Sequence, residues 1–399
     1  MTHFARETIL PPLQPDSTAD PDLTDLFGLT FAELGDFLVG RGLPAFRAQQ
    51  VAGWIYHSLV ADFALMRTLP AALRARLERE CTIKGPKVRA EAVSKDGRTR
   101  KLLLELRDGR LIETVLMLYP PVGEGRARAT VCVSTQAGCA YGCTFCATGQ
   151  MGFFRHLTAG EIVAQVMHFA RWLRANPWQD QGGHTIDHIT NLVFMGMGEP
   201  LHNYDSTLKA VRILNMPEGL NIGARHMTLS TVGLVPGILR LSTEPLQVNL
   251  AISLHAPSDE MRIRTMPVTR KYPLQAVLEA CQTYASRTNR QVTFEYILLA
   301  GINDQVEHAR ELAALLSPLL QLCHVNLIPV NATSAGYSPP SGEVIRRFRA
   351  QLDGLGVSNS VRAERGDDIA AACGQLHTLE SRVRARVDRV AVAESENQA

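Results

Sequence analysis

Hydrophobic positions change their spacing twice along the chain. Up to about residue 86 they recur at helical intervals, as Val51, Ile55 and Leu59 do at i, i+4 and i+8. Between 87 and 118 they form short strand-like runs separated by Asp96-Gly97 and Asp108-Gly109, dipeptides that favour hairpin turns. The pattern therefore predicts a helical unit followed by a short antiparallel sheet.

From residue 129 onward, strand-like runs alternate with helical ones. The predicted strands cover 129–136, 189–197, 226–233, 247–255, 291–299 and 323–330. The predicted helices cover 158–173, 203–215, 234–242, 273–287, 304–320 and 341–353. Six β–α units with right-handed crossovers form a parallel sheet. The sequence therefore predicts an α/β fold, a partial (β/α)6 barrel, with its chemistry at the C-terminal ends of the strands.

These patterns divide the chain into five stretches. Residues 1–22 are rich in Pro and Asp and are expected to form a disordered leader. A helical accessory domain over 23–86 and an antiparallel β extension over 87–128 come next. The barrel is expected over 129–388, including a segment around Cys373, and a polar tail over 389–399.

Composition places the chain among ordinary globular proteins. Of its 399 residues, 46% are hydrophobic and 20% charged. No run approaches the roughly 18 apolar residues of a membrane span, and the N-terminus lacks the order of a secretory signal. Eight cysteines without an even framework of spacings do not indicate a disulfide scaffold. We therefore expect a protein of the reducing cytoplasm that does not enter a membrane.

The net charge of +2 hides an uneven distribution. Residues 1–40 carry one Lys or Arg against seven Asp and Glu, whereas residues 41–110 carry fifteen against seven. Clustered basic residues are typical of a protein that binds a polyanion such as nucleic acid. A solvated basic surface without such a partner is the alternative.

Three cysteines, Cys139, Cys143 and Cys146, follow the first predicted barrel strand at C-x3-C-x2-C spacing. Three thiolates on one short loop can hold three irons of a cubane cluster, which leaves the fourth iron open to a small molecule. A structural zinc site needs four ligands, and the common ferredoxin run has another spacing. The spacing is the signature of the radical S-adenosylmethionine (SAM) enzymes, which the sequence resembles from here on. A zinc knuckle completed by Cys132 or Cys373, or three unligated core cysteines, remain alternatives.

Polar and small residues end several of the predicted strands. Glycines let the backbone approach a ligand closely, and a carboxylate can accept a hydrogen bond from an amine. Hydroxyl, imidazole and amide groups suit the ribose, carboxylate and adenine of SAM. Each such residue alone is more typical of a turn or cap, but together they predict one ligand site. The residues are Gly196, Gly198, Glu199, Ser230, Ser253, His255 and Asn331.

Longer motifs carry a resemblance to one family. They are Cys132, the cysteine triad, Gly-Met-Gly-Glu-Pro-Leu-His-Asn at 196–203, Ser-Leu-His at 253–255, and Arg-Gly-Asp-Asp-Ile-Ala-Ala-Ala-Cys-Gly-Gln-Leu at 365–376. Over about 23–385 the chain resembles the 23S ribosomal RNA adenine-C2 methyltransferases, the RlmN/Cfr family. It departs from radical SAM enzymes in that Met197 splits the glycines of their Gly-Gly-Glu motif. The stretch between Glu113 and Cys132 is longer than is usual in the family.

The resemblance implies a mechanism and a set of site residues. One [4Fe–4S] cluster on Cys139, Cys143 and Cys146 would use two SAM per turnover, one as methyl donor and one as radical source. Cys373 would carry the methyl group to C2 of adenine, and Cys132 would resolve the covalent adduct and leave a disulfide. Glu113 or Cys132 would take the ring proton. The SAM contacts implied are Gly198, Glu199, Ser230, Ser253, Leu254, His255 and Asn331.

The same resemblance implies partners. They are 23S rRNA, tRNA at the adenine beside the anticodon, an electron donor such as flavodoxin or ferredoxin, and a disulfide reductant. A monomer is expected. The basic helical module, with Arg98, Arg100 and Lys101, would hold the RNA backbone while the barrel mouth takes an unstacked base.

Three other functions compete with this one. An enzyme of the same mechanism could methylate C8 of the same adenine and confer antibiotic resistance. A radical SAM enzyme could act on a small molecule, although the basic module and Cys373 argue against it. A zinc-stabilised RNA-binding protein without catalysis is the alternative from another class.

Overall fold

The structure is a computed structural model that describes residues 23–121, 123, 125–180, 182–331, 336–362, 366–372 and 374–376. The predicted leader, the predicted tail and Cys373 lie outside the described residues, so the expectations for them stay predictions.

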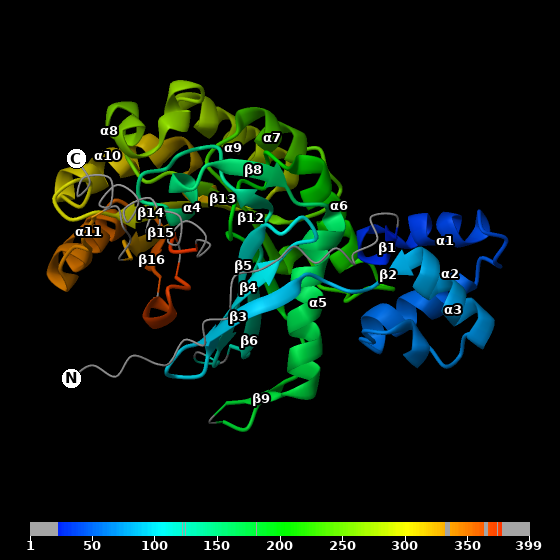
Figure 1. Cartoon of the computed structure of the whole chain (residues 1–399). Coiled ribbons are helices and arrows are strands. Elements are labelled where there is room, and N and C mark those ends of the chain that lie inside the picture. The colour runs from blue at the N-terminus through cyan, green and yellow to red at the C-terminus, as the bar shows by residue number, and fades with distance from the viewer. Residues whose placement is uncertain are drawn as a thin grey trace, which may run out of the picture.

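A ten-stranded sheet forms the centre of the molecule, in the order β16-β15-β14-β13-β12-β11-β6-β5-β4-β3 (Figure 1). Its middle is six neighbouring parallel strands. They are β6 (Arg128–Cys132), β11 (Asn191–Phe194), β12 (Met227–Thr231), β13 (Asn249–Ser253), β14 (Val292–Leu298) and β15 (Cys323–Pro329). The predicted α/β partial barrel is confirmed.

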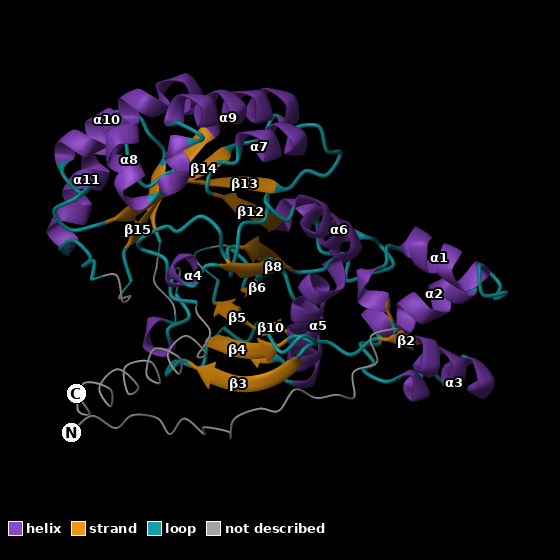
Figure 2. Ribbon diagram, turned by 45° about the horizontal axis from the view of Figure 1, so that its top comes forward, coloured by secondary structure: helices purple, strands orange, loops and turns teal. Residues whose placement is uncertain are grey.

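Helices cover the outer face of this curved sheet, as Figure 2 shows for β12 to β15. They are α5 (Ala159–Ala175), α6 (Tyr204–Asn215), α7 (Val235–Leu241), α9 (Leu274–Thr288), α10 (Val306–Leu316) and α11 (Gly342–Gly354). Each buries an apolar stripe against the strands, and this stripe produces the helical spacing of hydrophobic residues in the sequence. The helix α8 (Asp259–Thr265) and the edge strand β16 (Asn359–Val361) are among the elements that were not predicted, because both are short and polar.

The antiparallel extension is part of the barrel sheet. The strands β3 (Lys87–Val93), β4 (Thr99–Glu105) and β5 (Leu111–Tyr119) form as predicted, and β5 then pairs antiparallel with β6. We had expected a separate small sheet between the helices and the barrel. The pairing of Val115 with Cys132 instead places extension residues beside the first barrel strand.

The first predicted barrel strand is also shorter than expected. It ends at Cys132, because the chain then pairs β7 (Gln136–Gly138) with β8 (Phe153–His156) around the cysteine loop and the short α4 (Ala147–Gln150). The other described elements are a two-stranded ribbon and single turns of 3-10 or π helix. They are β9 (Trp178–Gln179), β10 (Thr185–Ile186), Leu26–Gly28, Gly53–His57, Phe63–Leu65, Ala224–His226, Pro267–Arg270, Ser317–Leu322 and Asp367–Ile369.

The helical module lies beside α5 and α6 (Figures 1 and 2). It contains α1 (Phe31–Val39), α2 (Arg47–Ala52) and α3 (Ala71–Glu80), and β1 (Thr24–Asp25) pairs with β2 (Cys81–Thr82) where the module begins and ends. Arg171 of α5 donates from Nε and Nη2 to the carbonyls of Leu59 and Val60 at 3.0 and 2.7 Å. At Gly160 a Cβ would lie 2.1 Å from Asp25 Oδ2, so the joint depends on the missing side chain.

The Asp25→Asn variant is expected to be more stable than the wild type above neutral pH. Burial raises the pKa of Asp25 from 3.8 to about 6, although the Phe27 N–H and Arg107 oppose the rise. The folded state therefore binds this proton more tightly, and wild-type stability falls as pH rises from about 4 to 6 and stays reduced above. Relative to Asp25→Asn, the wild type should lose up to about 3 kcal/mol of unfolding free energy at pH 8, and about half of that at pH 5. Urea unfolding of both proteins at the two pH values tests this, and a pH-independent gap contradicts it.

Candidate active site

A cavity of about 880 Å³, open to solvent, lies at the C-terminal ends of the parallel strands. Nine of the predicted site residues line it: Cys139, Cys143, Cys146, Gly196, Gly198, Glu199, Ser230, Ser253 and His255. Four others, Glu113, Cys132, Leu254 and Asn331, are buried but do not line it. The strand-end residues that line it thus converge as predicted.

The three cysteines of the loop face this cavity together. Burial raises the pKa of Cys139 to about 12 and raises the pKa of Cys143 and Cys146 as well. Backbone N–H groups oppose the rise, from Tyr141 toward Cys139 and from Gly149 toward Cys146. Thiols so buried become thiolates when a metal replaces their protons, and the N–H groups then stabilise the sulfur charge. The donor set fits an iron–sulfur cluster.

No three His, Cys, Asp or Glu side chains within the described ranges lie close enough together to hold a single metal ion. A cubane cluster spreads its ligands over three different irons, so this finding is compatible with the shared cavity of the triad.

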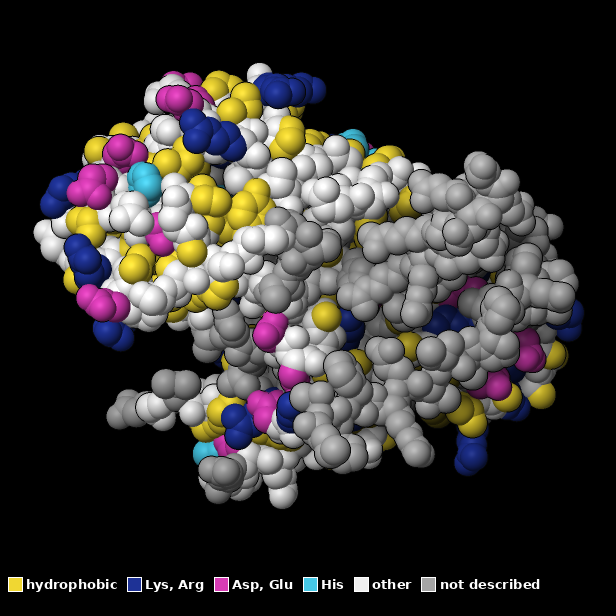
Figure 3. Space-filling model, turned by 60° about the vertical axis from the view of Figure 1, so that its left-hand side comes forward, with side chains coloured by type: hydrophobic (Ala, Val, Ile, Leu, Met, Phe, Trp, Pro, Cys, Tyr) yellow, Lys and Arg dark blue, Asp and Glu magenta, His cyan; other side chains and the backbone are white. Residues whose placement is uncertain are grey.

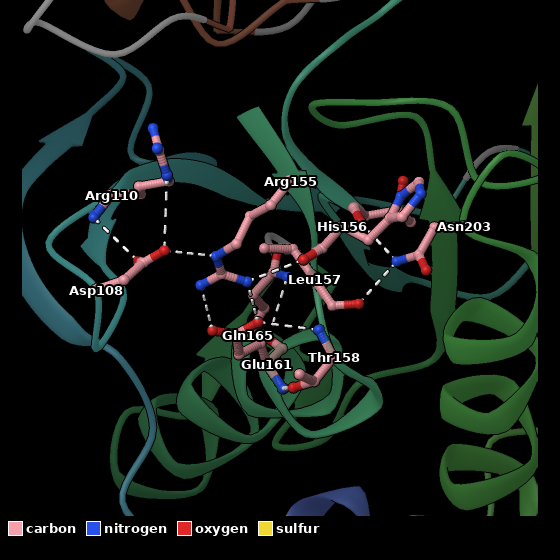
Figure 4. Close-up of polar contacts among 10 residues, drawn as sticks. Asp108, Arg110, Arg155, His156, Leu157, Thr158, Glu161, Gln165 and Asn203 are labelled. Carbon is pink, nitrogen blue, oxygen red and sulfur yellow. Dashed lines mark hydrogen bonds and ion pairs between the residues drawn. The ribbon is translucent and has the colours of Figure 1, made fainter. Parts of the chain in front are cut away.

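The ends of the cysteine loop are fixed by two side chains (Figure 4). Asn203 donates from Nδ2 to the carbonyls of Thr135 and Leu157, at 2.9 and 2.7 Å, and so joins the strands before and after the loop. Arg155 reaches Asp108 of the β4–β5 turn at 2.6 Å and both carboxylate oxygens of Glu161 at 2.7 and 2.8 Å. The loop is therefore anchored to the extension, to α5 and to α6.

Gly198 and Glu199 are held against the cysteine loop by Gln136. Gly198 has a φ of 99°, and a Cβ there would lie 2.5 Å from Gln136 Cβ, so glycine is required. The Glu199 N–H donates to Gln136 Oε1 at 2.8 Å. The Glu199 carboxylate accepts the N–H groups of Leu201 and Val232 at 2.9 and 2.8 Å. Burial raises the pKa of Glu199 to about 7, which these N–H groups partly oppose.

His255 presents a defined hydrogen-bond donor to the cavity. Its Nδ1 accepts the N–H of Ile297 at 3.0 Å, which leaves the proton of the neutral ring on Nε2. Burial lowers the pKa of His255 to about 3, with the charge of Arg262 adding to the effect, so the ring is neutral at physiological pH. The ring of Phe145, inside the cysteine loop, meets the imidazole edge-on at 4.9 Å between centroids.

Two charged cavity residues were missed by sequence reasoning, Glu295 and Arg362. Glu295 lies in β14, where Asn326 Nδ2 donates to its Oε2 at 2.8 Å and burial raises its pKa. The sequence feature that could have identified Glu295 is a carboxylate within a largely apolar strand, Val292–Leu298. Arg362 follows β16, which was not predicted, so nothing in the local pattern placed it near the site.

Glu113 and Cys132 lie together where the extension joins the barrel. Thr114 Oγ1 donates to the Cys132 carbonyl at 2.8 Å, and Ser134 Oγ donates to the Glu113 carbonyl at 2.6 Å. Lys101 Nζ lies 2.9 Å from Glu113 Oε1 and donates to the carbonyl of Ala370 at 3.0 Å.

The residues on either side of Cys373 connect the junction of Glu113 and Cys132 with the cavity. Gly374 lines the cavity, and its carbonyl accepts the N–H of Ala147 at 2.8 Å. Thr148 Oγ1 donates to the Leu376 carbonyl at 2.5 Å. The segment 366–376 is thus held by the extension through Lys101 and by the cysteine loop through α4.

Several basic residues form ion pairs with acidic side chains of the same protein. Lys101 is largely buried against Glu113, so the expectation that it holds the RNA backbone is wrong. Arg100 pairs with Glu91, and Arg76 pairs with Glu80. On the face shown in Figure 3, the visible Lys and Arg side chains lie dispersed among Asp and Glu. Part of the positive charge of residues 41–110 is therefore paired with acidic side chains of the protein itself.

Comparisons with known proteins agree with this geometry. Residues 24–83 match the ribosomal RNA large subunit methyltransferase N-terminal domain, and residues 133–313 match the radical SAM superfamily. A "Probable dual-specificity RNA methyltransferase RlmN" of Roseiflexus sp. (strain RS-1) is 47% identical over 89% of this chain and 96% of the relative. The chain belongs to the RlmN family of radical SAM RNA methyltransferases.

Other members of the RlmN family show the same extent of similarity. The "Ribosomal RNA large subunit methyltransferase N" of Nitrosopumilus maritimus is 45% identical over 89% of this chain and 99% of its own. The crystal structure of a radical SAM methyltransferase from Sphaerobacter thermophilus matches with a TM-score of 0.82 and 49% identity, over 89% of this chain and 99% of that one. Membership implies a [4Fe–4S] cluster, SAM and an RNA substrate. Within the described part of the chain, no helix is long and apolar enough to cross a bilayer.

Proposed function

We propose that the protein methylates C2 of an adenine in 23S rRNA, and the adenine beside the anticodon in tRNA, through a methyl group carried on Cys373. The observation that supports this most is the single cavity shared by the cysteine triad and Gly374, the residue after Cys373. A carrier thiol beside a radical-generating site fits a substrate carbon that is too electron-poor to take a methyl group by displacement.

The proposal assigns a role to each of the predicted cluster and SAM residues. Cys139, Cys143 and Cys146 hold the cluster, and Glu199 accepts the amine of SAM. His255 Nε2 donates to an acceptor of SAM, and Ser230, Ser253, Leu254 and Asn331 complete its surroundings. When bound, cluster and SAM supply the methyl group and a carbon radical, with two SAM used per turnover. Leu254 and Asn331 do not line the cavity, so their place in this proposal follows from membership of the family and not from the cavity.

The covalent steps use the thiols and a base. Cys373 sulfur takes a methyl group, and after hydrogen abstraction this carbon bonds to adenine C2. The ring proton passes to Glu113 or Cys132, and the unpaired electron that the addition leaves on the ring would return to the cluster. Attack by the Cys132 thiolate on Cys373 sulfur then forms a disulfide while the bond from that sulfur to the new methyl carbon breaks, and this carbon takes up a proton to complete the methyl group. The choice of Glu113 is supported by the pairing of β5 with β6, in which Val115, two residues along the chain from Glu113, lies opposite Cys132.

The product decides between this function and its rivals. Anaerobically reconstituted protein is given SAM with an isotopically labelled methyl group, a reductant and an rRNA fragment or tRNA, and the digested nucleosides are identified by mass spectrometry. Label in 2-methyladenosine that is absent with Cys373→Ala is the expected result. Label in 8-methyladenosine assigns the resistance activity instead, and SAM cleavage without labelled RNA rejects both RNA products. A zinc-containing, colourless wild type would support the non-catalytic alternative.

The remaining partners follow from this chemistry. Each turnover needs one-electron reduction of the cluster, for which a flavodoxin or ferredoxin is suited, and a reductant for the Cys132–Cys373 disulfide. We propose a monomer that works in the cytoplasm, where thiols stay reduced.

SAM affinity is expected to depend on pH through Glu199. Binding of the SAM ammonium needs the Glu199 carboxylate, and burial raises the pKa of Glu199 to about 7. Below this pH a proton must leave first, so the dissociation constant should rise roughly tenfold per pH unit between pH 7 and 5. Equilibrium binding of SAM to the reconstituted protein measures it. The control Glu199→Gln should bind weakly with no such slope, and an equal slope in both proteins would exclude Glu199.

A further inference from the structure

Arg262 of α8 places a guanidinium in the interior, at the ends of two barrel strands. Its side chain is fully buried. Nε donates to the Leu254 carbonyl at 3.0 Å, and Nη2 donates to the carbonyls of Val232 and Ser253 at 2.7 and 3.0 Å. Nη1 donates to Thr269 Oγ1 at 3.1 Å. The side chain therefore ties together the chain just after β12 and β13.

All four of these acceptors are neutral. Over the described ranges, no carboxylate forms an ion pair with Arg262, and exposed Asp259 on the same helix acts on it only through space. The Asp259 Oδ1 instead accepts the Leu274 N–H at 2.7 Å. A buried charge with only neutral partners is costly, so such charges are normally matched by an opposite charge. The protein part alone supplies no matching anion here.

The cysteine loop is joined directly to the helix of Arg262. The last residue of α8, Thr265, accepts the Thr144 N–H at 2.9 Å, which fixes the helix to the residue next to Cys143. Val232 and Ser253, whose carbonyls accept from Arg262 Nη2, both line the cavity that the cysteine triad faces. Arg262 does not line the cavity, so it acts on a ligand there through its field and not by direct contact.

A [4Fe–4S] cluster on three thiolates provides the missing negative charge. Its oxidised form carries one net negative charge, and addition of one electron makes it two, so a fixed positive charge nearby favours the reduced form. We propose that Arg262 is the internal counter-charge of the cluster and holds its reduction potential up. This rests on the proposed cluster site of Cys139, Cys143 and Cys146, and the electron comes from the external one-electron donor.

The experiment is a redox titration with dithionite of the reconstituted full chain without SAM, followed by the electron paramagnetic resonance of the reduced cluster. Two variants remove the charge, Arg262→Met and Arg262→Gln, and Arg262→Lys keeps it. The control is Arg171→Met, which removes a partly buried guanidinium that also donates to backbone carbonyls, between α5 and the helical module.

At the wild-type midpoint potential, the neutral variants should show at least a tenfold lower ratio of reduced to oxidised cluster, a shift of 59 mV. Arg262→Lys should keep most of the wild-type ratio, and Arg171→Met should keep all of it. A complete cluster in a neutral variant with the wild-type midpoint overturns the proposal.

Cluster loading separates the remaining outcomes. If only the neutral variants fail to load iron while Arg262→Lys loads it, the counter-charge is needed even for the oxidised cluster, which supports the proposal. If Arg262→Lys fails as well, the role is structural and the proposal is wrong. A wild type that binds no iron and sulfide instead rejects the proposed cluster site itself.

Discussion

The Cys143→Ser variant is expected to be colourless, to cleave no SAM and to methylate no RNA. Cys143 is the middle ligand of the triad and is buried, so no solvent-derived ligand can replace it easily. A serine hydroxyl does not lose its proton as a thiol does, which leaves two ligands for the cluster. The loss should exceed the roughly 10- to 100-fold that a metal site loses when only a supporting group is removed. Iron and sulfide content, the visible spectrum and 5′-deoxyadenosine release measure it.

The matched control is Cys281→Ser. Cys281 is also fully buried, in α9, but it does not line the cavity. Its substitution introduces the same hydroxyl into the same kind of interior and should leave cluster content and SAM cleavage at wild-type levels. If Cys143→Ser keeps wild-type iron content and SAM cleavage, the triad is not the cluster site.

The parts of this molecule that follow from local pattern were predictable. The triad lies within eight residues, so its spacing alone indicates a shared metal group. Gly198, Ser230 and Ser253 lie far apart in sequence, yet each lies at or just after the C-terminal end of a parallel strand, and such ends meet at one edge of a sheet. Their convergence was therefore predictable once the six β–α units were recognised.

The parts that depend on pairing between distant strands were not predictable. Nothing in the sequence of β5 shows that it joins the barrel sheet beside Cys132, because that depends on a register between separate strands. The register also decides on which face of the sheet Lys101 lies, because a shift by one position turns a strand residue from the surface to the interior. Without the register, Lys101 could be taken for a surface residue that contacts RNA. Arg262 was missed because a charged residue on a short helix is normally exposed.

Lys101→Met is expected to uncouple RNA methylation from SAM cleavage. The ammonium joins Glu113 to the carbonyl of Ala370, three residues before Cys373. Its loss removes the positive charge beside a buried carboxylate, which should cost about 3 kcal/mol of stability, and it frees one of the contacts that position the carrier segment. A displacement of about 1 Å at a reacting group costs roughly 100-fold in rate. Single-turnover methylation should therefore fall roughly 100-fold, while 5′-deoxyadenosine formation falls far less, because the cysteine triad and Glu199 are untouched.

The control is Arg89→Met, which breaks another ion pair of the extension, that of Arg89 with the buried Glu105. It should lower stability in the same way without separating the two activities, because no contact of Arg89 reaches the described part of segment 366–376. Stability loss alone would reduce methylation and SAM cleavage in parallel in both variants. That outcome, or a Lys101→Met protein with wild-type methylation, would show that the Glu113–Lys101–Ala370 link does not position the carrier. Uncoupling confined to Lys101→Met would instead connect the extension directly to methyl transfer.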